Sequence, residues 1–161
     1  ALATQLFFLF QRMQQIQDLK QRSLFEKVRV ADFIIEKDRL FAEVTLSPEE
    51  MHLYDKVYEH ITIDAPSPDL VIYLQAPIEI LKERITKRGN INEQYLTLEY
   101  LERLNDAYSR FFLDYKDAPL LIINAADINL ESNERDYESL VSMIMSNPKG
   151  KNFINPQPSI I

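Results

Sequence analysis

The sequence predicts an α/β fold in which a parallel sheet is covered by helices on both faces. Two continuous apolar runs, 69–76 and 119–126, suit strands that are buried on both sides. Segments with helical periodicity separate the strands, and parallel strands need crossover connections of this length. With 161 residues, 46% of them hydrophobic and 27% charged, the chain fits one domain with a substantial core. We expect this domain over 1–148 and an extended tail over 149–161.

The chain opens with a predicted amphipathic helix that runs to about residue 22. Its apolar side chains recur at helical spacing, at Leu2, Leu6, Leu9, Phe10, Met13 and Ile16. No Ser, Thr, Asp or Asn precedes the first apolar turn in the role of an N-cap. We therefore expect the natural protein to extend upstream of Ala1, which makes the domain incomplete at its N-terminus.

A first strand is predicted over 28–35, which is rich in valine and isoleucine. The next helix has a strong start signal. Ser47 is placed as its N-cap, Pro48 stands at the first helical position, and Glu50 completes a capping box. This helix is expected to end near Ile61.

Strands and helices alternate through the rest of the chain. Pro66 and Pro68 interrupt the chain before the first apolar run. The expected elements are then the strand 69–76, a helix from Pro77, a long helix over 97–116, the strand 119–126 and a last helix over 136–146.

Composition excludes several classes of function. With 18 basic and 25 acidic residues, the net charge is −7 and the pI is near 4.9, which argues against binding of nucleic-acid polymers. No apolar run approaches the ~20 residues that span a bilayer, so we expect no membrane partner. The absence of cysteine suits the cytoplasm and removes thiolate chemistry. His52 and His60 have no nearby carboxylate cluster, so no metal site is predicted.

Four basic residues lie close together after the first apolar run. They are Lys82, Arg84, Lys87 and Arg88. Arg84 and Arg88 are four positions apart, so one helical face could direct both at an anion such as phosphate. The alternative is a solvated helix end, where cations also suit the helix dipole. Because the chain contains only 2 glycines, Gly89 and Gly150, no glycine-rich phosphate loop is present among its residues.

Several segments match one known family. The string Arg84-Ile85-Thr86-Lys87-Arg88-Gly89, followed by Glu93-Gln94 and Leu98-Glu99-Tyr100-Leu101, resembles the lid and following helix of the deoxynucleoside kinase family. The run 69–77 is similar to the strand before that lid, and 38–42 is similar to the segment after the strand that carries a substrate-contacting acid. The resemblance covers nearly all of 1–147 and implies a P-loop kinase-like fold that acts as a homodimer.

The resemblance implies that three residues bind the nucleobase. Gln5 would pair with the base, while Arg12 and Asp38 would frame it. Helical geometry places Gln5 and Arg12 on one flank of the first helix, and an amide offers the donor and acceptor that a base edge requires. Without the resemblance, Gln5 would be interpreted as an exposed helix residue. An Arg12 and Asp38 pair is typical of members that accept deoxyadenosine, deoxyguanosine or deoxycytidine rather than thymidine.

The resemblance also implies roles around the sugar and phosphates. Arg84 and Arg88 would stabilise the transferring phosphoryl group, and Glu93 and Tyr100 would hold the sugar. Binding of ATP would involve Arg88 together with the loop residues Asp127 and Ile128. For Asp127 the alternative is an ordinary turn residue.

Three departures from the family pattern have consequences. Phe33 and Asn90 stand where many relatives carry arginine. The family's phosphate loop and catalytic carboxylate belong to a region upstream of the match, so Mg²⁺ would be held mainly by that region. We therefore expect the 161-residue chain to be the C-terminal part of a kinase for a purine deoxynucleoside, and to be inactive alone. The alternatives are a catalytically inactive interaction or dimerisation module and a nucleoside monophosphate kinase.

Overall fold

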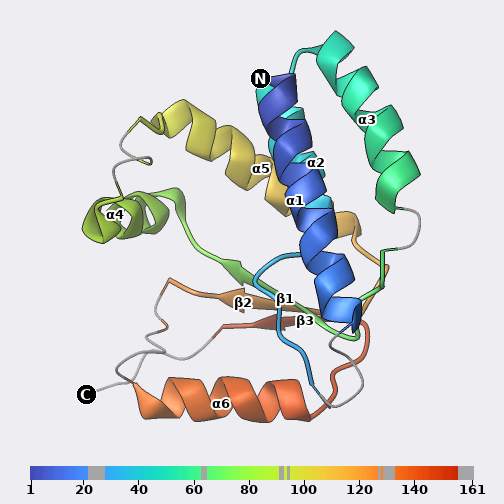
Figure 1. The fold of residues 1–161 in the computed structure, drawn as a ribbon. Helices are drawn as coiled ribbons and strands as arrows, with labels where there is room; N and C mark the ends of the chain where they lie inside the picture. Colours follow the sequence, from blue (N-terminus) through green and yellow to red (C-terminus); the bar gives the residue numbers. More distant parts are fainter. Residues whose placement is uncertain are drawn as a thin grey trace. The chain divides into compact units, whose positions relative to one another are not determined.

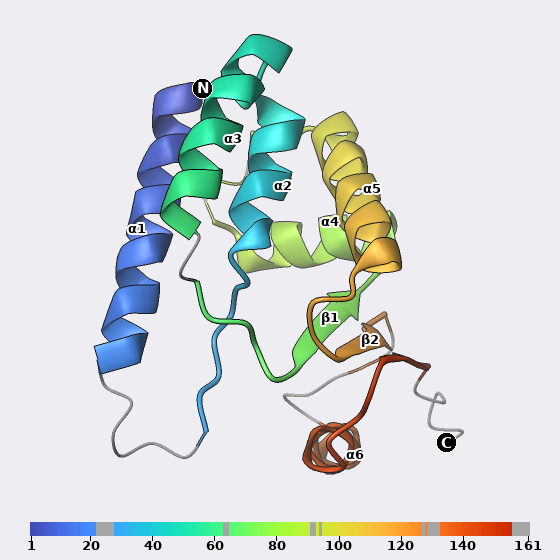
Figure 2. The same ribbon diagram turned by 90° about the vertical axis from the view of Figure 1, so that its right-hand side faces the viewer.

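The structure is a computed structural model that contains two compact units, Ala1–Ser67 and Pro68–Ile161. Figures 1 and 2 show its elements from two directions. The residues described are 1–21, 28–62, 65–90, 93, 95–126, 128 and 133–155. None of the helices in these ranges is long and apolar enough to cross a membrane.

The first unit consists of three mutually packed helices, namely α1 (Leu2–Gln21), α2 (Glu36–Thr45) and α3 (Pro48–Thr62). Its core is centred on Leu9, Ala42 and Tyr54, one from each helix, and all three are fully buried. The apolar positions predicted in the first helix supply this face, since Leu2 and Leu6 pack against the same cluster.

The predicted capping box at the start of α3 is confirmed. The backbone N–H of Glu50 donates to Ser47 Oγ at 3.3 Å, and the backbone N–H of Ser47 donates to Glu50 Oε2 at 3.2 Å. These bonds satisfy donors that have no partner within the helix. The second oxygen of Glu50 accepts from the backbone N–H of Leu2 at 3.3 Å, so one carboxylate also ties the beginning of α1 to α3.

The prediction of a strand over 28–35 is wrong. These residues are irregular, and the chain then enters α2, a helix that the sequence did not predict. A strand needs a neighbour for its ladder of hydrogen bonds, and none of the described strands pairs with this segment. The alternation of valines at Val28 and Val30 misled the prediction, because both side chains are largely exposed.

The second unit contains the parallel sheet. Strands β1 (Val71–Gln75), β2 (Leu120–Asn124) and β3 (Lys151–Ile154) are hydrogen-bonded in the order β1-β2-β3, with β2 in the centre. The register pairs Val71 with Leu120 and Leu120 with Lys151. Part of the predicted extended tail therefore forms a strand of the sheet.

Helices cover both faces of this sheet, as predicted. In both views α6 (Glu134–Met145) lies on one face, whereas α4 (Ile78–Arg88) and α5 (Leu98–Asp114) lie on the other (Figures 1 and 2). Tyr73 of β1 stacks on Phe112 of α5 with ring centroids 4.2 Å apart, and this contact fixes α5 against the sheet.

The burial of the two predicted strands differs. β2 is buried along most of its length, as expected for a strand buried on both faces. β1 was expected to be equally buried, but Ile72 and Leu74 are 38% and 50% exposed. The prediction for β1 is wrong because β1 lies at an edge of the described sheet, and the side chains on one of its faces are incompletely covered.

Candidate functional site

In the first unit, Arg12 of α1 and Asp38 of α2 form a partly buried ion pair. The Nε atom of Arg12 donates to Oδ2 of Asp38 at 3.0 Å, and the Asp38 side chain is only 8% exposed. Asp38 is the one charged residue classed as buried within the described ranges. The structure thus brings together two of the three residues predicted to contact a base.

Burial sets the electrostatics of this pair. Loss of solvent raises the pKa of the Asp38 carboxyl above its ordinary value, although Arg12 and Lys37 act in the opposite direction. A buried carboxyl is tolerated because the guanidinium satisfies one of its oxygens. Asp38 Oδ1 has no hydrogen-bond partner within the described ranges, so it remains available as an acceptor.

Gln5 lies on the same helix as Arg12 but does not touch it. The two residues are seven positions apart, which places their Cα atoms about 10 Å apart along one flank of α1. Gln5 is half-buried, and its side-chain amide makes no hydrogen bond to another described residue. Its predicted role at the base edge stays a prediction.

Sequence reasoning missed two further neighbours of Arg12. The Phe33 ring lies under the guanidinium, with Cζ of Arg12 4.3 Å from the ring centroid. Nη1 of Arg12 lies 3.5 Å from Oε1 of Gln15, one turn along α1. Helical spacing could have found Gln15, but nothing local links position 12 to position 33.

In the second unit, Arg84 bonds to the carboxyl end of β2. Its Nη2 atom donates to the backbone oxygen of Ala125 at 2.6 Å, with the backbone oxygen of Ala126 at 3.4 Å. The carboxyl ends of parallel strands are where ligands bind in such sheets. Arg84 is therefore at the predicted edge, although its own contacts are with main-chain carbonyl groups.

Arg88 contacts Glu93 instead of sharing a partner with Arg84. Its Nε and Nη2 atoms lie 3.1 Å and 2.6 Å from Glu93 Oε2, and Asn90 Nδ2 lies 3.5 Å from the other oxygen. The Arg88 side chain is 63% exposed, so it can also reach a ligand in solvent. Convergence of Arg84 and Arg88 on one anion stays a prediction.

The remaining residues predicted in this unit are Tyr100, Asp127 and Ile128. Tyr100 lies in the first turn of α5, and its backbone N–H donates to the N-cap oxygen Thr97 Oγ1 at 3.2 Å. Ile128 is half-buried, whereas Asp127 lies outside the described residues. No group of three or more histidine, cysteine, aspartate or glutamate side chains in the described ranges could hold a metal ion.

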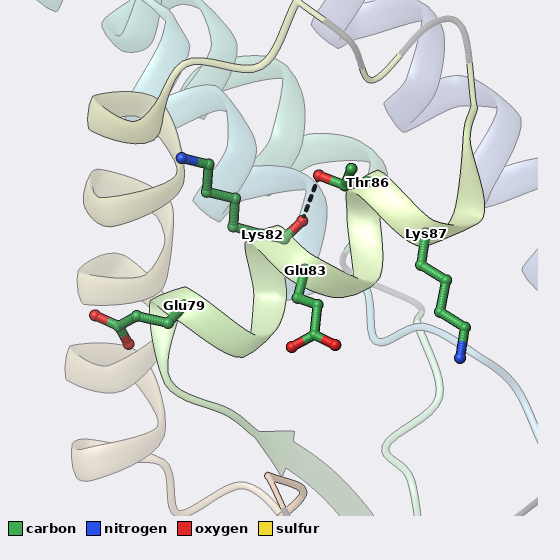
Figure 3. Close-up of a pocket in the computed structure, with 5 residues that line it drawn as sticks. All are labelled: Glu79, Lys82, Glu83, Thr86 and Lys87. Carbon is green, nitrogen blue, oxygen red and sulfur yellow. Dashed lines mark hydrogen bonds between the residues drawn. The ribbon is translucent and has the colours of Figure 1, made fainter.

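Two of the hollows in the structure are shallow, and neither is lined by Arg12, Asp38, Arg84 or Arg88. One, of about 540 Å³, lies on α4 and is lined by Glu79, Lys82, Glu83, Thr86 and Lys87, as Figure 3 shows. The Thr86 hydroxyl donates to the backbone oxygen of Lys82 at 2.9 Å within this hollow. A face of one helix does not enclose a ligand, so we assign it no role.

Comparison with known families gives one match that covers most of the chain. Residues 1–147 match the family model described as deoxynucleoside kinase. The chain is 31% identical over 145 residues to the deoxyguanosine kinase of Bacillus subtilis, which covers 87% of this chain and 70% of that protein. It is 27% identical over 152 residues to the deoxyadenosine/deoxycytidine kinase of the same organism, covering 88% and 68% of the two chains.

Solved structures show the same fold. A deoxyadenosine kinase from M. mycoides with bound dCTP superposes with a TM-score of 0.75 at 22% identity, over 90% of this chain and 73% of that one. The same enzyme with bound dATP gives a TM-score of 0.74 at 23% identity, over 88% and 72%. The arrangement of strands and helices is thus that of a P-loop kinase fold.

Proposed function

The chain belongs to the deoxynucleoside kinase family, and on this premise we propose that it serves phosphoryl transfer from ATP to the 5′-hydroxyl of a purine deoxynucleoside. Deoxynucleoside kinases are ATP-dependent phosphotransferases. The observation that carries the proposal is the Arg12–Asp38 pair, a charged couple held 3.0 Å apart in the first unit. Purine preference is further supported by the similarity of the chain to the deoxyguanosine kinase of Bacillus subtilis.

The chemistry of the first unit suits a nucleobase. The guanidinium of Arg12 is donor-only and the ionised carboxylate of Asp38 is acceptor-only, so together they recognise a base edge that carries both kinds of group. Gln5 adds an amide with one group of each kind. These side chains require a polar ligand with defined donors and acceptors, which an apolar ligand would leave unsatisfied.

The second unit offers groups for the sugar and phosphates. Arg88 is an exposed cation suited to a phosphoryl oxygen, and Arg84 is the second candidate. We assign Glu93 and Tyr100 to the sugar, with the Glu93 carboxylate accepting from a hydroxyl group. In the structure Glu93 neutralises Arg88, so binding of sugar and phosphate at these two residues would require them to exchange partners.

ATP is the implied phosphoryl donor, and Arg88, Asp127 and Ile128 are the residues proposed to contact it. The guanidinium of Arg88 fits the phosphates. Mg²⁺ is implied by the chemistry of phosphoryl transfer, but the described residues contain no carboxylate set that could hold it.

We further propose that these residues act as the carboxyl-terminal part of the kinase. The deoxyguanosine kinase relative is matched over 70% of its length, and the 161-residue sequence contains no glycine-rich phosphate loop. The sequence of the natural gene tests this directly. A Gly-x-x-Gly-x-Gly-Lys-Ser/Thr pattern after a strand would support the proposal, and a start codon at the position of Ala1 would favour a non-catalytic module.

A homodimer is proposed as the assembly. Phe7 and Phe10 of α1 are 58% and 54% exposed, and they lie three positions apart on one face. Large exposed aromatics on one helix face are typical of association surfaces. Analytical ultracentrifugation of the chain and of a Phe7→Glu/Phe10→Glu variant tests the assembly, since a monomeric parent chain would contradict it.

Kinetics in the natural protein test the function. We expect kcat/KM to be highest for deoxyguanosine or deoxyadenosine, lower for deoxycytidine and poorest for thymidine. Asp38→Asn and Arg12→Met should lower kcat/KM for the best purine on the order of 10-fold or more, since each leaves a base polar group without its partner. A thymidine value above the purine values would contradict the proposed base class.

A further inference from the structure

We infer that Phe33 is a positioning residue that fixes the guanidinium plane of Arg12 for recognition of the nucleobase. The inference rests on the proposed function, since it takes Arg12 to be a base contact. Phe33 stands at a position where many relatives carry arginine. All the residues concerned lie within the first unit.

Three contacts restrain the Arg12 guanidinium. Asp38 Oδ2 accepts from Nε at 3.0 Å and Gln15 Oε1 lies 3.5 Å from Nη1, while the Phe33 ring centroid lies 4.3 Å from Cζ. The bond to Asp38 alone would allow the guanidinium to tilt. A ring at this distance from Cζ opposes such tilting through cation–π attraction and stacking.

The restraint leaves part of the guanidinium available. A guanidinium has five N–H donors. Nε uses its one donor on Asp38 and Nη1 directs one at Gln15, and no other donor of Arg12 has a hydrogen-bond partner within the described ranges. The remaining donors on Nη1 and Nη2 suit acceptors on the edge of a purine, such as O6 and N7 of guanine. Fixing the plane would fix where these donors point.

The aromatic residue at position 33 is suited to this task. An arginine there would place a second cation beside Arg12 and repel it, and a leucine would fill space without the quadrupole that attracts a cation. Phe33 is half-buried and lines a hollow of about 540 Å³ together with Gln15 and Asp32. Because space adjoins this ring, we expect modest replacements at position 33 to fold.

NMR of the arginine side chain tests the positioning directly in the 161-residue chain. The Nε–H signal of Arg12, assigned by its loss in Arg12→Met, should show the ring-current shift and slow solvent exchange of a stacked, bonded group. In Phe33→Leu we expect that shift to disappear and exchange to accelerate, while Phe33→Tyr should retain both. An Arg12 signal that is the same in Phe33→Leu as in the parent chain would overturn the inference.

Kinetics in the natural protein test the consequence. Phe33→Leu should raise KM for the preferred purine deoxynucleoside about three- to tenfold with kcat nearly unchanged, and Phe33→Tyr should restore the parental KM. An unchanged KM in Phe33→Leu would overturn the inference even if the NMR signal moved. Arg12→Met distinguishes failure of the inference about Phe33 from failure of the proposed base contact of Arg12. If it impairs the enzyme while Phe33→Leu does not, only this inference fails, and if it has no effect, the proposed base contact fails as well.

Discussion

The Nη2 atom of Arg84 lies 2.6 Å from the backbone oxygen of Ala125, which ties the middle of α4 to the residue that follows β2. The backbone N–H of Ala125 in turn donates to the oxygen of Gln75 at the end of β1, at 2.7 Å. The guanidinium of Arg84 therefore lies at the carboxyl end of the sheet and donates to its main chain. Arg84 thus holds a main-chain oxygen of the sheet, whereas Arg88 holds the side chain of Glu93, and the two arginines should respond differently to substitution.

The first prediction separates these arginines. In the natural protein, Arg88→Ala should lower kcat on the order of 10²-fold with little change in Tm, because the Arg88 side chain is 63% exposed. Arg84→Ala should lower kcat and also Tm, since it removes the bond to Ala125. Kinetics with thermal unfolding of both variants check this. Activity within about twofold of the parent protein would contradict a catalytic role for both arginines.

The second prediction concerns pH. Burial raises the pKa of Asp38 above its ordinary value of 3.8, so the folded state retains a proton that the unfolded chain has released. The stabilisation from this group is therefore fully present below pH 3.8 and is lost as the pH rises through the folded pKa. Asp38→Asn cannot titrate. The difference in unfolding free energy between the two proteins should shift in favour of Asp38→Asn as the pH rises.

Urea unfolding of both proteins between about pH 3 and pH 7 measures this difference. Other titrating groups are common to the two chains and cancel. A shift in favour of the parent chain with rising pH would mean that Arg12 outweighs burial and lowers the pKa of Asp38.

The third prediction concerns Tyr54, which is fully buried in α3 while its hydroxyl has no hydrogen-bond partner among the residues that the structure describes. Burial is also the main cause that raises the pKa of this phenol, with the charge of Asp38 next. Tyr54→Phe should raise the unfolding free energy by about 1 kcal/mol, because it removes an unsatisfied polar atom and keeps the ring. As a control, Tyr54→Ala should cost about 3–5 kcal/mol. Destabilisation by Tyr54→Phe would reveal a partner for the hydroxyl.

The fourth prediction concerns the 161-residue chain by itself. It should show no ATP-dependent phosphorylation of any deoxynucleoside, because its residues include no phosphate-cradling loop and its described part no metal-holding carboxylates. A coupled assay for ADP with all four deoxynucleosides measures this. Turnover by the purified chain would show that another group performs the task of the phosphate loop.

Much of the fold could be predicted because its signals are local. The central strand β2 is a continuous apolar run. The start of α3 is recognisable from the capping-box residues Ser47 and Glu50 and from Pro48 at the first helical position. In contrast, α2 was missed because it is short and strongly charged and buries only Asp38, Leu40 and Ala42. Its stability depends on packing against α1 and α3, which no local pattern reveals.

Prediction of the strand β3 and of the contacts at the base site failed for the same reason, because both depend on residues that are distant in the sequence. β3 is four residues long with only two apolar side chains, Phe153 and Ile154, so its pairing with β2 decides its structure. At the candidate site, the residue types Arg12 and Asp38 followed from the family resemblance. The contact between the Phe33 ring and Arg12 depends on the path of the segment before α2 past α1, and no local sequence pattern predicts that path.

The carboxylate of Glu50 also bears on how the first unit acquires its structure. It accepts from Ser47, three residues away, and from Leu2, which is 48 residues distant in the chain. The local bond can form as soon as α3 nucleates, whereas the distant one must wait until a long loop has closed against its entropy. The first turn of α1 should therefore gain protection from hydrogen exchange only late in folding, after α3 is in place.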